Sequence, residues 1–320
     1  MGMAACIWGT LYMLNRPTWV GAKEIEIYQG MTLQQIGQTL YDEGLIRSPG
    51  LLELFARFNG TSRQLTAGVH PFHGSMTTWQ VLLELEQPRD VVRDVTLPEG
   101  LRKEHSAHIL AEKLDLDEGK LLAYMHDPAF CRSLNIPAND MEGYLFPETY
   151  KISTSSTEDQ VLRLLVSHFF DIFDGRLQAR AREIGLSMHE AVILASIIEG
   201  EAKMDSERSV ISAVYHNRLR QNMRLQADPT VQYALPEGPR RLFYKDYKIE
   251  SPYNTYLYPG LPPGPIMNPG RASLEAAVFP AEAEYLYFVA RGDGSHVFTH
   301  TPEEHEKAKR STQNDRLRSW

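Results

Sequence analysis

Cysteine is scarce in this sequence, lysine and arginine form no runs, and no hydrophobic stretch is long. Cys6 and Cys131 are the two cysteines among 320 residues, so the chain has no disulfide framework and no cysteine-rich metal pattern. The net charge of −8 is spread along the chain, which argues against nucleic acid as the main partner. The histidines His296, His300 and His305 are not spaced as a compact metal set. We therefore expect no metal, no other cofactor and no nucleic-acid partner.

The apolar stretch at the N-terminus, Met1–Leu14, is shorter than the roughly 20 residues that cross a bilayer. The basic segment that precedes the apolar part of a signal peptide is also missing. We interpret residues 1–20 as the back half of a transmembrane anchor followed by a linker. The alternatives are the remnant of a leader peptide or a disordered tail.

A pattern of strand, turn and helix recurs three times between residues 24 and 114. Each copy alternates apolar and polar residues, passes a glycine turn, and continues with apolar residues at helical spacing. The turn glycines are Gly30, Gly74 and Gly100, and Thr32 and Thr77 are predicted helix N-caps. A chain of 320 residues is long enough for two domains. We expect an α+β protein, with small β/α units over residues 21–135 and a mixed α+β domain over residues 136–320.

The stretch Ala191–Ala202 reads as a helix that is apolar nearly all round and carries acidic groups at its end. Ser187 and Glu190 are spaced as a capping box, so we expect Glu190 to be structural. A carboxyl group carried on an apolar helix is desolvated, holds its proton more tightly, and can act as an acid near neutral pH. Such an acid is a common means of breaking a glycosidic bond.

Two acids at the end of this helix, Glu199 and Glu201, point about 200° apart around its axis. Glu199 shares its face with the small residues Ala195 and Ser196, so this face is predicted to lie beside a cleft. The alternative is that either glutamate is an ordinary solvated residue at a helix end.

Beyond this helix the chain becomes rich in tyrosine, proline and amide side chains. Asp228 and Pro229 are typical of a helix start, which gives Asp228 a structural interpretation, whereas Gln226 has none as clear. The many prolines stiffen a long loop. Aromatic faces together with amide and hydroxyl groups on a rigid loop suit the binding of a sugar ring. For any single tyrosine, the alternative is that it only fixes the loop to the domain.

Several motifs, in this order, resemble the endolytic murein transglycosylase, or YceG-like, family. They are EGYLFPETY, SIIEGEA, NRL, MRLQADPT, YNTY, GLPPGPI and YLYFVARGDGSHVF, which span about residues 140–305. The first β/α unit is similar to the LysM-like module that precedes the catalytic domain of such enzymes, and this module is either a glycan-binding module or a spacer. The resemblance implies a single-pass enzyme of the bacterial inner membrane, with its catalytic domain on the extracytoplasmic side.

The resemblance also implies the substrate and the residues of the site. The family cuts nascent peptidoglycan strands internally, peptidoglycan synthases are possible partners, and the family's catalytic glutamate corresponds to Glu199. Arg218, or alternatively Arg208, is available to carboxylates of the peptide or lactyl groups. The predicted sugar contacts are Gln226, Tyr253, Asn254, Thr255 and Tyr256.

In the expected reaction, Glu199 protonates the oxygen between N-acetylmuramic acid and N-acetylglucosamine. The muramyl C6 hydroxyl then attacks its own C1, which leaves a 1,6-anhydro end and requires no second carboxylate. Two alternatives stay open. One is a hydrolytic muramidase that pairs Glu199 with Asp228, Glu148 or Asp205. The other is a non-catalytic scaffold that binds the cell wall.

Overall fold

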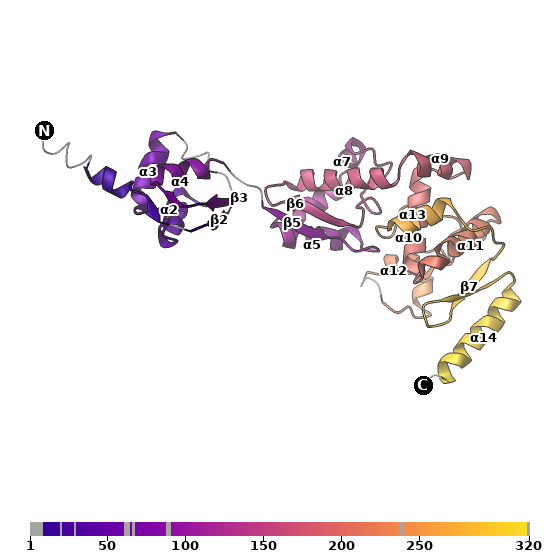
Figure 1. The fold of residues 1–320 in the computed structure, drawn as a ribbon. Coiled ribbons are helices and arrows are strands. Elements are labelled where there is room, and N and C mark those ends of the chain that lie inside the picture. The colour runs from indigo at the N-terminus through magenta and orange to yellow at the C-terminus, as the bar shows by residue number, and fades with distance from the viewer. Residues whose placement is uncertain are drawn as a thin grey trace. The chain divides into compact units, whose positions relative to one another are not determined.

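The computed structural model describes residues 9–19, 21–28, 30–60, 65, 68–87, 91–236 and 240–318, and its fold is mixed α+β (Figure 1). Within these ranges the strands form four separate two-stranded pairs, so helices supply most of the buried apolar surface. The chain forms two compact units. The first comprises residues 1–93 and 151–156, and the second comprises residues 94–150 and 157–320.

The first unit holds two short antiparallel strand pairs, β1 with β4 and β2 with β3, together with α2, α3, α4 and a helical segment at residues 9–14. Apolar residues at the predicted spacings, such as Ile25, Ile36, Phe72 and Leu82, are buried together as its core. Its elements are β1 (Thr18–Trp19), β2 (Lys23–Ile27), α2 (Leu33–Asp42), α3 (Pro49–Phe58), β3 (Gly68–Phe72), β4 (Ser75–Met76) and α4 (Thr78–Leu85).

The predicted caps of the first two β/α copies are confirmed. Thr32 caps α2 and Thr77 caps α4, each as half of a capping box with the glutamine three residues later. Gly30 and Gly74 both have positive φ angles, of 88° and 70°, which a glycine adopts without strain. Strand, turn and helix therefore follow one another as the alternation predicted.

The predicted anchor at residues 1–20 falls only in part on the described chain, because Met1–Trp8 and Val20 lie outside it. Residues 9–14 are helical. None of the helices that the structure describes has both the length and the apolar character needed to cross a membrane.

The second unit begins within β5 (Val92–Thr96) and contains the third predicted copy, whose helix is α5 (Lys103–Leu114). Strand β5 pairs with β6 (Thr149–Ser153), and the hydroxyl groups of Thr96 and Thr149 lie 2.9 Å apart. The remaining elements are α6 (Glu118–Met125), α7 (Pro128–Ser133), α8 (Glu158–Ile172), α9 (Gly175–Glu183), α10 (Met188–Glu201), η1 (Asp205–Glu207), α11 (Arg208–Arg220), α12 (Asp228–Ala234), η2 (Asp246–Lys248), α13 (Arg271–Val278), β7 (Tyr287–Ala290), β8 (His296–Thr299) and α14 (Pro302–Arg318).

The boundary between the units differs from the division predicted between residues 135 and 136. The third copy lies in the second unit because its contacts are made there. The Leu97 N–H donates to the Glu148 carbonyl oxygen at 3.0 Å, and the Gly100 N–H donates to the Asn268 carbonyl oxygen at 2.9 Å. A repeated sequence pattern gives the order of elements, but it does not say which distant strand or loop each copy will pair with.

The amphipathic pattern from Glu158 to about Ile184 predicts one long helix. This prediction is wrong, since the structure has α8 and α9 there. Helix α8 ends at Ile172, and Asp174 starts a new helix by accepting hydrogen bonds from the N–H groups of Arg176 and Leu177. A short acidic side chain that captures free N–H groups favours a helix start over a helix interior.

The core of the second unit is built around α10, which packs against α11, α12 and α13. Figure 1 shows α10, α11 and α13 gathered on one side of this unit, with α14 against the β7–β8 hairpin. The turn residues 291–295 between two apolar runs, Tyr285–Ala290 and His296–Thr299, predict a hairpin. This prediction is confirmed, and the register pairs Tyr287 with Thr299 and Ala290 with His296.

Candidate active site

Helix α10 forms as its sequence predicts. Ser187 caps it and forms the capping box with Glu190, so the structural interpretation of Glu190 is confirmed. Every residue from Ala191 to Ile198 is buried, as expected of a helix that is apolar all round. The acids Glu199 and Glu201 come at its last turn, where the helix leaves the core.

The face that carries Glu199 does not border an open cleft along its length, so this expectation is wrong. Ala195 and Ser196 are both fully buried. The Ser196 hydroxyl donates to the Ile193 carbonyl oxygen at 2.7 Å and accepts the Ile266 N–H at 3.1 Å. Small side chains let the segment before α13 approach the helix closely, and this segment covers the face up to Glu199.

The Glu199 carboxyl group is held from two directions and only 8% of its side chain is exposed. Its Oε2 atom lies 3.2 Å from Nη1 of Arg208, on α11, and accepts the N–H of Gly270 at 3.0 Å. Gly270 is the N-cap of α13, so the carboxyl group also faces the positive end of that helix dipole. A guanidinium group, an N–H group and a helix N-terminus all stabilise a carboxylate in one fixed position.

Arg208 is itself fixed by neighbours on both sides. Its Nε atom donates to Oδ1 of Asp205 at 2.9 Å, and its Nη1 atom donates to the hydroxyl of the fully buried Ser273 at 2.5 Å. The guanidinium group therefore serves two carboxylates, of which Asp205 is 84% exposed and Glu199 is nearly buried.

Glu201 faces the opposite side of α10, as the helix geometry predicts, and lies in a second acidic cluster. Its Oε1 atom accepts the Tyr215 hydroxyl at 3.1 Å, while Asp228 accepts the Tyr256 hydroxyl at 2.6 Å. Burial, with a contribution from the charge of Asp228, raises the pKa of Glu201 to about 7. The two acids of this helix thus have separate partners.

The structure brings two of the predicted sugar contacts together. The Gln226 N–H donates to the Thr255 carbonyl oxygen at 3.1 Å, and the Thr255 hydroxyl accepts the Ala227 N–H at 3.0 Å. Gln226 is exposed and has a φ of +50°, in the left-handed region that residues other than glycine seldom adopt. Thr255 is buried and also lies 2.9 Å from the Thr230 hydroxyl.

Two other predicted contacts, Asn254 and Arg218, are buried and bonded to the backbone. The Asn254 amide donates to the carbonyl oxygens of Tyr247 and Ile249 and accepts the Tyr256 N–H, at 2.9–3.0 Å. The Arg218 guanidinium donates to the carbonyl oxygens of Leu286 and Leu225 at 2.7 and 2.5 Å. Asn254 uses both amide donors and Arg218 uses its Nε and Nη1 atoms in these bonds, so the two side chains hold the loops in shape.

Tyr253 and Tyr256 are partly exposed, and each contacts another aromatic ring. The ring of Tyr253 lies 4.7 Å from that of Tyr233, and the ring of Tyr256 lies 4.6 Å from that of Tyr247. Burial is the largest cause that raises the pKa of both hydroxyl groups, so both are protonated donors at neutral pH.

Asn254→Ala tests whether this asparagine holds the loop or binds substrate. We expect the substitution to destabilise the second unit by about 1–3 kcal/mol, because buried carbonyl groups would lose their donors. Thermal unfolding and the KM for glycan strands should be measured together. A raised KM with an unchanged melting temperature would contradict the structural role and support direct contact with sugar.

Sequence reasoning missed Glu99, which lies on the turn between β5 and α5. Its carboxyl group packs against Gly270, the residue whose N–H binds Glu199. The available signal was the Pro-Glu-Gly turn itself, which places a charged residue at a tight corner between a strand and a helix.

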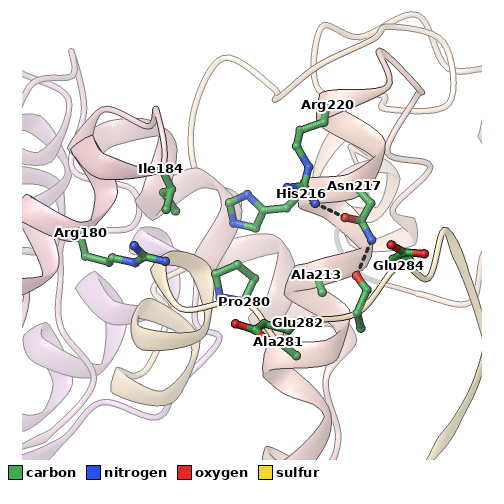
Figure 2. A pocket seen from close by; sticks show the side chains of 11 residues that line it. Arg180, Ile184, Ala213, His216, Asn217, Arg220, Pro280, Ala281, Glu282 and Glu284 are labelled. Atoms are coloured by element: carbon green, nitrogen blue, oxygen red, sulfur yellow. Dashed lines mark hydrogen bonds between the residues drawn. The ribbon is translucent and has the colours of Figure 1, made fainter.

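The cavity in Figure 2 lies elsewhere in the second unit, between α9, α11 and the segment that follows α13. It has a volume of about 570 Å³ and is lined by residues that include Arg180, His216, Arg220, Glu282 and Glu284. Asn217 bridges it by donating to the Ala283 carbonyl oxygen at 2.8 Å (Figure 2). None of the predicted site residues lines this cavity.

Across the described ranges, no group of three or more His, Cys, Asp or Glu side chains is placed to hold a metal ion.

Comparison with known proteins gives consistent results. The YceG-like family model matches residues 25–311. The chain is 32% identical over 301 residues to the endolytic murein transglycosylase of Bacillus subtilis (strain 168), covering 89% of this chain and 83% of that protein. It is 27% identical to the endolytic murein transglycosylase of Streptococcus pneumoniae serotype 2 (strain D39), covering 88% of this chain but only 57% of that longer protein.

A crystal structure of a YceG-like protein from Listeria monocytogenes resembles this one with a TM-score of 0.62 and 32% sequence identity. The match covers 89% of this chain and 98% of that one. The family match extends over both units and includes Glu99, Glu199, Arg208 and Gly270. This chain belongs to the YceG-like family.

Proposed function

We propose that this chain is a lytic transglycosylase that cuts the glycan strands of peptidoglycan internally, between N-acetylmuramic acid and N-acetylglucosamine. One observation carries the proposal. In a chain whose relatives are named endolytic murein transglycosylases, a nearly buried carboxyl group, Glu199, is fixed by Arg208 and the Gly270 N–H. Enzymes place such fixed carboxyl groups where protons must be transferred.

Glu199 is the proposed acid and base of the reaction. The C1–O bond breaks as the glycosidic oxygen takes a proton, and the muramyl C6 hydroxyl attacks C1 and gives its proton back. Because the nucleophile belongs to the same sugar, it replaces water and forms a 1,6-anhydro ring at a low entropic cost. The fixed carboxylate suits the second half of this sequence, in which the C6 hydroxyl is deprotonated.

The proposed sugar contacts divide into two groups by their exposure. Gln226 is exposed and Tyr253 and Tyr256 are partly exposed, so these three can reach a bound strand. Asn254, Thr255 and Arg218 are buried, and their proposed part is to keep the surrounding loops in position. Rigid loops lower the cost of ordering the site when a flexible glycan binds.

The first unit and the cellular location belong to the same proposal. We propose that the β/α region up to residue 135 is LysM-like and contributes a glycan-binding module or a spacer. We further propose that the N-terminal segment anchors the chain in the bacterial inner membrane, with the second unit outside the cytoplasm and close to peptidoglycan synthases. The resemblance of the first β/α copy and the apolar character of Met1–Leu14 support these statements.

The length of purified glycan strands tests the proposed activity. Strands incubated with the full chain should become shorter across the whole distribution, with few disaccharides at early times, because an internal cutter acts at any position. Chromatography of the strands by length would show this. An unchanged length distribution, with the protein still bound to strands, would contradict an enzyme and favour the scaffold alternative.

A further inference from the structure

The turn that carries Glu99 is fastened to the loop before α13. Gly100 follows Glu99 with a φ of +76°, which favours glycine at this corner. The Gly100 N–H donates to the Asn268 carbonyl oxygen at 2.9 Å, and the Asn268 N–H and side-chain amide both donate to the Leu101 carbonyl oxygen, at 2.8 and 3.0 Å. Asn268 is 1% exposed, so the turn is attached to the protein core.

This attachment brings two carboxyl groups to one glycine. A methyl group on Gly270 would lie 1.9 Å from Oε1 and 2.8 Å from Oε2 of Glu99, which means that the carboxyl group fills the space beside the Gly270 Cα atom. The N–H of the same residue donates to Oε2 of Glu199 at 3.0 Å. The turn is also close to Glu199 itself, because a methyl group on Gly100 would lie 3.9 Å from its Cγ atom.

The charges around Glu99 are unbalanced. Carboxyl groups come from Glu99 on the turn, Glu199 on α10 and Asp205 on η1, whereas Arg208 on α11 is the cation that acts on Glu99. Arg208 already pairs with Glu199 and Asp205. Partial burial and then the charge of Glu199 raise the pKa of Glu99, Asp205 adds to the effect, and Arg208 opposes it.

Two carboxyl groups that lie at one glycine, with one arginine acting on both, cannot both be charged without a cost. Glu199 is nearly buried and paired with Arg208, whereas Glu99 is exposed to solvent. We propose that Glu99 is a second carboxyl group of the active site, and that Glu99 and Glu199 together hold the single proton that the reaction donates and recovers. This inference rests on the proposed lytic transglycosylase function.

The proton balance of the cycle closes within the pair. The pair gives its proton to the glycosidic oxygen. This oxygen departs from C1 and takes the electrons of the broken C1–O bond with it. The C6 hydroxyl oxygen then bonds to C1, and its proton returns to the pair. No water is consumed, and the pair regains its starting state with one proton and one negative charge.

Glu99→Gln tests the proposal, with Glu112→Gln as a matched control because Glu112 is an exposed residue on the neighbouring helix α5. The rate of strand cleavage should be measured as a function of pH. In the intact chain, activity needs the shared proton, so it falls as pH rises. Removing the charge of Glu99 weakens the hold on that proton, so the alkaline limb of the pH–rate profile should move to lower pH by about one unit. This shift lowers kcat by up to about tenfold at pH values above the limb.

Further variants and products make the outcome decisive. Glu99→Asp keeps the charge and should keep the alkaline limb near its original pH, and Glu112→Gln should match the unmodified chain. An unchanged profile for Glu99→Gln, or an equal loss at every pH, would overturn the inference. If the unmodified chain forms 1,6-anhydro ends, such a result would affect only the role of Glu99. If it forms none, the proposed function itself would fail.

Discussion

Glu199→Gln is expected to lower the kcat for strand cleavage by about 10²–10⁴-fold, the range typical of losing a positioned acid or base. The amide has the same shape and its oxygen can still accept the Gly270 N–H, but it cannot donate and recover a proton. Arg208 keeps Asp205 and Ser273 as partners, so we expect the fold to survive. Initial rates on purified glycan strands would measure the loss.

Glu201→Gln is the matched comparison, because it makes the same change two positions along the same helix. Glu201 faces Tyr215 and the Asp228 cluster, away from Arg208 and Gly270. A Glu199→Gln protein that binds strands and cuts them at the normal rate would contradict the assignment. Loss of activity only in Glu201→Gln would move the catalytic role to the other side of α10.

Arg208→Met is expected to destabilise the second unit by about 3–5 kcal/mol, the cost of breaking a buried ion pair from one side. The change would leave the Glu199 carboxylate, 8% exposed, with only the Gly270 N–H and the α13 dipole to stabilise it. Three of the four tryptophans, Trp8, Trp19 and Trp79, belong to the first unit, and the fourth is the last residue of the sequence, Trp320, so tryptophan fluorescence is a poor probe of this site. Hydrogen exchange of the α10 and α13 amides would report the loss.

The double variant Arg208→Met with Glu199→Gln supplies the control for that prediction. A neutral amide needs no cation, so most of the lost stability should return in the double variant. Equal instability in the single and double variants would show that Arg208 acts through its packing and through Ser273. A single variant as stable as the unmodified chain would show that the ion pair contributes little.

Features set by neighbours in sequence could be predicted. The caps at Thr32, Thr77 and Ser187 depend on residues only three positions away, and each was predicted from its pattern. The break between α8 and α9 was missed because Asp174 stands inside a continuous amphipathic pattern, and its capping role is stronger than that periodicity. The alternation around Val95 predicted a strand and a helix, but not their partner β6.

In the candidate active site, too, features set by nearby residues could be predicted, whereas features set by distant contacts could not. The apolar pattern of α10 drew attention to Glu199 and separated it from Glu201, and the structure gives the two acids different partners. Glu99 could not be found in this way, because it meets Glu199 through contacts such as the bond from Asn268 to Leu101, which spans 167 positions. Asn254 illustrates the reverse problem, since a polar residue in a tyrosine-rich loop suggests sugar binding, whereas its amide is bonded within the protein.

The mass of the new glycan ends tests the central claim most directly. Purified peptidoglycan strands should be cut with the full chain, and the fragments analysed by mass spectrometry. A lytic transglycosylase that uses the muramyl C6 hydroxyl should give 1,6-anhydro ends, each lighter by one water than a hydrolysed end, and Glu199→Gln should give almost none. Fragments with hydrated, reducing ends would contradict the account and identify a hydrolase.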